Sequence, residues 1–171
     1  MKVRAVLMAT ALLAVFSIPT LATAQAAASN QARGPIWVSV PTSAASLESL
    51  SAKAPANGNL IITVTGTLIY EHNYGAQGWY CLTLSQTAGN VGACVPDGGS
   101  DSAIRGDIAA AEPTTVSGMG ASQPYSIVRS FPVTAGTNYN FYLSGDATGF
   151  AGAWLFQPSI TAIFVPTTLA P

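Results

Sequence analysis

The 171-residue chain carries few charged side chains, only 8% of its residues. Past residue 24, four basic residues stand against seven acidic ones, a formal charge of −3. Four scattered bases are too few for the positive patch of a nucleic-acid binder or for a polybasic membrane-binding segment, so composition excludes both classes of partner.

Residues 1–24 have the pattern of a secretory signal peptide. Lys2 and Arg4 precede an apolar run, which is followed by a small-x-small cleavage motif that ends at Ala24. The run is shorter than the roughly 20 residues that a membrane span needs. We expect cleavage after Ala24, with Ala26 as the alternative. The product should be a secreted or periplasmic protein of about 147 residues without a membrane span.

Export changes how the two cysteines are interpreted. In an oxidising compartment, Cys81 and Cys94 are expected to form a disulfide, and the single histidine of the chain cannot complete a zinc site. If the two cysteines face each other in an antiparallel hairpin, the tip falls at residues 87–89. Gly89 then occupies the position of a three-residue loop that favours a left-handed backbone.

The first half of the mature chain predicts a mobile tail at 25–34, followed by strands in a single β-sandwich domain at 35–171. "PIWVSV" is a first short strand. "SLESLSAKAP" is ambiguous between a helical turn and a strand, and the turn sequence "APANGN" that follows it favours a strand. In "LIITVTGTLIY" apolar and threonine residues alternate with period two. Gly66 falls on the apolar face there, where a bulge or a close neighbour would explain it.

The second half predicts further short strands separated by turns rich in Gly, Pro, Asp and Asn. The expected strands are "WYCLTLSQ", "YSIVRSFPV", "NYNFYLSG", "AWLFQ" and "SITAIFVP". Residues 97–124 form a long acidic stretch, and we expect at least one short strand or helical turn around "AIRGDIAAAE". Many short strands without a convincing helix predict an all-β fold, a sandwich or a barrel, with one disulfide-braced hairpin.

Two segments support this fold by resemblance. "RSFPVTAGTNYNFYLSG" at 129–145 and "SITAIFVP" at 159–166 resemble the jelly-roll modules of the C1q and tumour-necrosis-factor-like class. "SAKAPANGNLIITVTGTLIY" at 51–70 is similar to the opening strands of small secreted bacterial β-sandwich proteins of unknown role. The resemblance implies an antiparallel β-sandwich of jelly-roll type with ten strands, which often trimerises and binds partners through its loops. The collagen-like stalk common beside C1q modules is absent.

Catalytic motifs are not found. A serine hydrolase would have to use His72, yet no G-x-S-x-G occurs and "VSGMG" lacks the leading glycine. His72 is therefore interpreted as a loop residue just past a strand, and we expect the protein not to be an enzyme. The alternative is a secreted hydrolase that uses the loop carboxylates of Glu71, Asp107 and Glu112.

One group of aspartates suggests metal binding. Asp97, Asp101 and Asp107 put oxygen ligands on a glycine-rich stretch, which makes them calcium candidates. Their spacing departs from the EF-hand pattern, so no cofactor is expected. A calcium-dependent carbohydrate-binding protein is the third reading of the chain.

Aromatic residues are the remaining binding candidates. Trp37, Trp79 and Trp154 could form sugar-stacking platforms or an oligomer face, although such residues more often fill a sandwich core. Because loops carry binding residues more often than core strands do, Tyr74, Gln77 and Trp79 are the predicted binding residues. The sequence thus predicts a secreted, non-catalytic module for binding or self-assembly. Its partners would be further copies of itself, a glycan or a surface protein.

Overall fold

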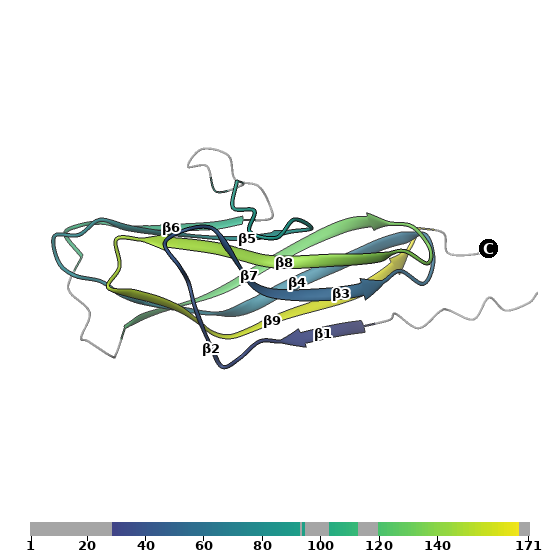
Figure 1. Cartoon of the computed structure of the whole chain (residues 1–171), viewed down its shortest axis with the longest axis horizontal. Coiled ribbons are helices and arrows are strands. Elements are labelled where there is room, and N and C mark those ends of the chain that lie inside the picture. The colour runs from purple at the N-terminus through teal and green to yellow at the C-terminus, as the bar shows by residue number, and fades with distance from the viewer. Residues whose placement is uncertain (1–28, 93, 95–102, 113–119, 168–171) are drawn as a thin grey trace, which may run out of the picture.

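The computed structural model describes residues 29–92, 94, 103–112 and 120–167 (Figure 1). Within these ranges the chain forms nine strands and no helix. The strands are β1 (Ser29–Arg33), β2 (Trp37–Ser39), β3 (Ala45–Lys53), β4 (Gly58–Glu71), β5 (Gly78–Ser85), β6 (Ala103–Ile108), β7 (Ala121–Val133), β8 (Asn138–Thr148) and β9 (Gly152–Pro166). The predicted all-β class is therefore confirmed, while the ten strands implied by the C1q resemblance are not matched in the described part.

Two antiparallel sheets stack face to face, as Figure 1 shows. Sheet A has the order β1-β9-β4-β7, and β2 also pairs with β9; sheet B has the order β3-β8-β5-β6. Only β5 and β6 are both consecutive in sequence and paired. Strands β1 and β2 both pair with β9 in sheet A, and each of the other connections crosses between the sheets. The order β2-β9-β4-β7 facing β3-β8-β5-β6 is that of a jelly roll, which confirms the predicted sandwich.

The core lies between the sheets and follows from strand alternation. Leu60, Ile62 and Val64 on β4 are at most 2% exposed, whereas the threonines between and after them point outward. From the facing sheet, Phe141 on β8 meets Phe131 on β7 with ring centroids 4.9 Å apart. Period-two patterning in the sequence thus separates a buried face from an outer face on each sheet.

Sheet A contains a bulge at Gly66, as its place on the apolar face predicted. Between the pairs Thr65 with Ser159 and Thr67 with Phe156, two residues of β9 oppose the single Gly66 of β4. A Cβ added to Gly66 would also lie 2.6 Å from the Tyr125 hydroxyl, so both expected explanations hold.

The same bulge corrects one prediction about β9. "AWLFQ" and "SITAIFVP" were expected to be separate strands, but they form one strand that runs from Gly152 to Pro166. Pro158 interrupts the hydrogen-bond ladder without ending the strand, because a bulge needs no backbone donor at that point. Gln157 beside it has a φ of 50°, a left-handed backbone that is uncommon outside glycine.

Two further boundaries differ from the sequence expectations. Residues 29–33, placed in a mobile tail, form β1 and pair with β9 from Ser29 with Ile163 to Arg33 with Ser159. The stretch 97–124 contains β6, as expected, but β7 begins at Ala121 rather than after the stretch. In both places the sequence lacks alternation of apolar residues, so pairing with a neighbouring strand decides the outcome.

The predicted disulfide between Cys81 and Cys94 is present, with the Cα atoms 5.9 Å apart. Gly89 has the expected left-handed backbone, with φ of 67°. The predicted pairing of two cysteine-bearing strands is wrong, since Cys81 on β5 lies opposite Arg105 of β6. Cys94 belongs to the connection from β5 to β6, so the bridge ties this connection to the outer face of sheet B.

Hydrogen bonds hold the same connection against sheet B. Gly89 N donates to the Ser144 hydroxyl over 3.0 Å, and the Thr83 hydroxyl donates to the Asn90 carbonyl. Thr83 and Ser144 are consequently buried even though they belong to the outer face of the sheet. None of the described residues forms a helix of the length and hydrophobicity that a membrane crossing requires.

Candidate functional site

The predicted binding residues surround the connection from β4 to β5 but do not form one site. Tyr74 is 71% exposed at the tip of this connection, and Gln77 is exposed further along. Trp79 belongs to β5 and lies half-buried on the outer face of sheet B, where the Arg105 guanidinium carbon is 5.3 Å from its ring centroid. This cation–π contact already covers part of the indole face that a ligand would use.

His72 follows β4 directly, as predicted, and is 1% exposed. Its Nε2 lies 2.7 Å from the carbonyl oxygen of Ala76. A carbonyl oxygen only accepts, so Nε2 donates in this hydrogen bond. The imidazole thereby closes the connection between β4 and β5, which is a structural task.

Two of the three carboxylates proposed for a hydrolase, Glu71 and Asp107, lie on opposite sides of the sandwich. Glu71 ends β4 and lines a hollow on the outer face of sheet A, whereas Asp107 on β6 lies opposite Trp79 on the outer face of sheet B. An Arg105 Nη2 atom lies 2.9 Å from Asp107 Oδ1, and its hydrogen bonds lower the pKa of that carboxyl. Glu71 and Asp107 therefore cannot flank one scissile bond.

The calcium candidates are described only in part. Asp97 and Asp101 lie outside the described residues, and Asp107 is engaged by Arg105. Within the part of the chain that the structure describes, no three His, Cys, Asp or Glu side chains gather in a way that could hold a metal ion.

The outer face of sheet A has an aromatic hollow of about 330 Å³. Its lining residues are Trp37, Ile69, Glu71, Gly120 and Trp154. They come from β2, β4, β9 and the residue before β7, and strand register brings them together, with Ile69 opposite Trp154 in the β4–β9 pair. The hollow is mostly apolar and has one carboxylate at its rim.

Local contacts orient both indoles of the aromatic hollow. Trp37 is 53% exposed and packs against Phe156, with ring centroids 4.9 Å apart and planes inclined at 53°. The Trp154 ring lies over Gly152, so closely that a Cβ at this glycine would collide with the indole. Both rings are supported from behind, which leaves aromatic surface directed at solvent.

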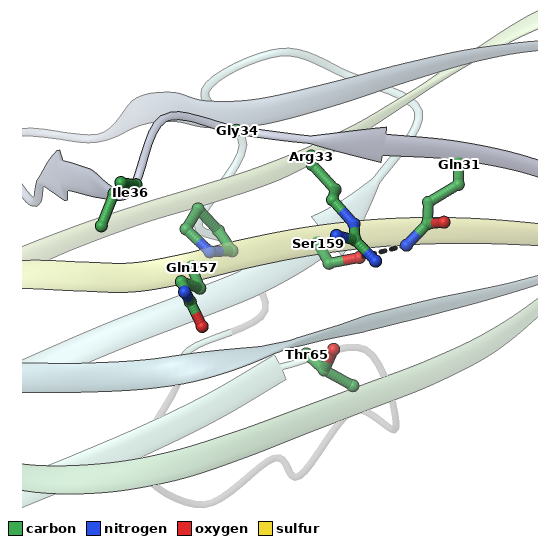
Figure 2. A pocket seen from close by; sticks show the side chains of 8 residues that line it. Gln31, Arg33, Gly34, Ile36, Thr65, Gln157 and Ser159 are labelled. Atoms are coloured by element: carbon green, nitrogen blue, oxygen red, sulfur yellow. Dashed lines mark hydrogen bonds between the residues drawn. The ribbon is translucent and has the colours of Figure 1, made fainter.

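A second and larger hollow, the polar hollow of about 520 Å³, lies on the same side of sheet A. It is lined by Gln31, Arg33, Gly34, Ile36, Thr65, Gln157, Pro158 and Ser159. Figure 2 shows Gln31 and Arg33 reaching from β1 across β9 to Ser159, and Gln31 Nε2 donates to the Ser159 hydroxyl over 3.4 Å. The side chains that line it include no carboxylate.

Sequence reasoning named Trp37 and Trp154 only as general aromatic candidates and preferred the loop residues. Strand alternation could have predicted that Trp154 faces outward, because Ala153 and Leu155 on either side of it are buried. The polar hollow had no such signal, because its residues come from β1, the β1–β2 connection, β4 and β9 and meet only when the sheet forms.

The strand order and the exposed face of sheet A define the chain as a jelly-roll β-sandwich with two hollows on one sheet. No protein-family model and no curated protein matches the chain. Among solved structures, it is similar to one titled "Structure of infectious bursal disease virus Gx strain", with a TM-score of 0.40, 13% identity and coverage of 85% of this chain and 33% of that one.

A second solved structure, "Crystal structure of infectious bursal disease virus VP2 subviral particle", also has a TM-score of 0.40 and 13% identity. The match covers 91% of this chain and 37% of the viral one, so the chain spans about a third of the length of both viral chains. The jelly-roll assignment stands on the strand order itself.

Proposed function

We propose that the protein is an exported, non-catalytic module that binds glycans on the outer face of sheet A. The observation behind the proposal is the aromatic hollow, where two tryptophans with supported rings flank an apolar floor and one carboxylate. Flat aromatic faces pack well against the C–H faces of sugar rings, and a carboxylate accepts hydrogen bonds from sugar hydroxyls. A volume of about 330 Å³ lies within the range of small-ligand sites.

A binding role fits the positions of the polar residues better than catalysis does. Glu71 and Asp107 are on different faces, His72 closes a loop, and Asp107 is engaged by Arg105. Acid–base chemistry on a glycan needs two carboxylates across one cleft. Export agrees with the signal-like pattern of residues 1–24 and with the disulfide.

Binding to a panel of neutral oligosaccharides tests the proposal. Cello-, xylo- and chito-oligosaccharides would be titrated while tryptophan fluorescence and isothermal heats are recorded. Burying one exposed indole face contributes roughly 1 to 2 kcal/mol, so Trp154→Ala should weaken binding about five- to thirtyfold. Trp37→Ala should have an effect of the same order.

The matched control is Trp79→Ala, which removes a half-buried tryptophan from the opposite sheet. It should leave glycan affinity unchanged. Equal losses for Trp79→Ala and Trp154→Ala would place the site elsewhere, and binding of no sugar by the folded wild type would refute the proposal for this panel. Product analysis after long incubation should find the oligosaccharides intact.

Self-association is a second candidate because the other end of the same face is apolar. Val128, Ile163 and Val165 are 52%, 43% and 40% exposed, and Ile61 lies opposite Ile163 in the β4–β9 pair. Large exposed apolar patches mark interaction sites on many proteins. Sedimentation velocity should then show dimers or larger species that Ile163→Lys converts to monomers, whereas a monomer at high concentration would refute this candidate.

A further inference from the structure

We infer that the glycan is acidic, a uronate-containing polysaccharide whose carboxylate is held in the polar hollow by Arg33. This inference rests on the proposed glycan-binding function and adds the class of ligand. It follows from three features of sheet A: the chemistry of the polar hollow, the unpaired charge of Arg33, and the continuity of the two hollows along β9.

Five of the eight residues that line the polar hollow have side chains that can donate a hydrogen bond. Arg33 supplies a guanidinium, Gln31 and Gln157 supply amide groups, and Thr65 and Ser159 supply hydroxyls (Figure 2). A guanidinium pairs with a carboxylate through two parallel hydrogen bonds, which neither an ammonium group nor an amide can reproduce. A planar carboxylate with sugar hydroxyls beside it matches this set of donors.

Arg33 is exposed and has no carboxylate partner among the described residues, where the one ion pair is Arg105 with Asp107. Glu48 approaches the hollow closely, since its Oε2 occupies the space that a Cβ on Gly34 would need. No ion pair joins Glu48 to Arg33, and Glu48 Oε1 accepts a hydrogen bond from its neighbour Ser49 N. The guanidinium therefore remains available to an external anion.

The two hollows are neighbours along one strand. Trp154 and Ser159 are five residues apart on β9, at most about 17 Å at 3.3 Å per residue. The bulge at Gln157 and Pro158 lies between them, and Gln157 N donates to the Ile36 carbonyl over 2.9 Å. Bulges often re-aim side chains beside binding sites. An oligosaccharide stacked on Trp154 can thus extend along β9 and present a carboxylate to Arg33.

The test compares polygalacturonate oligomers with their methyl esters, which share a backbone and differ in charge. Wild type should bind the acidic oligomer more tightly by about three- to tenfold, a modest factor because Arg33 is exposed to solvent. Arg33→Gln should reduce this ratio to about one while binding of the ester persists. Arg33→Lys should retain part of the preference, because the charge stays but the paired hydrogen bonds are lost.

The control is Lys53→Gln, which removes an exposed cation at the end of β3 in sheet B and should leave the ratio unchanged. Equal wild-type affinity for acid and ester, or an unchanged ratio in Arg33→Gln, overturns the inference. If Trp154→Ala still weakens binding in that case, the proposed glycan-binding function stands without the inference about charge. Failure of wild type to bind either oligomer also overturns the inference, and the neutral panel then decides the proposed function separately.

Discussion

Removing the disulfide should lower the free energy of unfolding by about 3 kcal/mol. Cys81 and Cys94 are 13 residues apart, and the chain-entropy model gives this value for a closed loop of that length. Domains are typically stable by only 5–15 kcal/mol, so the loss is a large fraction of the total. The melting temperature should fall by about 10 °C.

Two samples that lack the disulfide separate the entropy of the unfolded chain from the packing of the cysteine side chains. Urea unfolding, followed by tryptophan fluorescence, would be measured for the double variant Cys81→Ala and Cys94→Ala and for wild type reduced with dithiothreitol. Alanine is chosen because Cys81 is fully buried and a serine hydroxyl would need a new hydrogen-bond partner. Both samples should lose similar stability, because constraint of the unfolded chain is the shared cause.

A loss below about 1 kcal/mol, with the bridge of wild type verified by mass, would refute the reasoning. The hydrogen bonds from Thr83 to Asn90 and from Gly89 to Ser144 also hold this connection. The variant without the disulfide should retain its glycan affinity when folded, because Cys81 lies on sheet B and both hollows lie on sheet A.

Three further substitutions test packing, electrostatics and the site. Gly66→Ala should destabilise the fold by about 1–3 kcal/mol in urea unfolding, because its Cβ would lie 2.6 Å from the Tyr125 hydroxyl; an unchanged midpoint would contradict this packing. Burial raises the pKa of the Asp146 carboxyl, so the folded chain binds the carboxyl proton more tightly than the unfolded chain does. At neutral pH the ionised carboxylate therefore lowers the stability of the fold. Asp146→Asn should be more stable at pH 7, with an advantage that shrinks toward about pH 4; a pH-independent difference would count against this. Gly152→Ala should displace the Trp154 ring and weaken glycan binding several-fold, a loss that unchanged affinity would disprove.

Strands were predictable wherever one face of a segment is buried. β4 was found from its alternating residues, and Gly66 from the interruption of that pattern. β1 and the first residues of β7 were missed, because their sequences carry no alternation and they form strands by pairing with β9 and β4. The split of β9 was expected because proline usually ends a strand, whereas a bulge accommodates Pro158.

Candidate site residues were likewise predictable from local position in the chain but not from contacts between distant strands. Loop position favoured Tyr74 and Trp79, yet Tyr74 lies at the exposed tip of the β4–β5 connection and Trp79 is partly covered by Arg105. Trp37 and Trp154 are 117 positions apart in the chain and meet only across β9 and its neighbours, so no local pattern could join them. Arg33 was counted as one scattered base until β1 placed it beside Ser159.

By itself the sequence determined the all-β class, the disulfide partners and the scarcity of charge, because these depend on residue type and on local period-two patterning. Tertiary structure decided which outward-facing residues become neighbours. In a jelly roll nearly every connection crosses between sheets, so strands adjacent in space are distant in sequence. Both hollows arise from that crossing pattern, since each collects side chains from at least three strands.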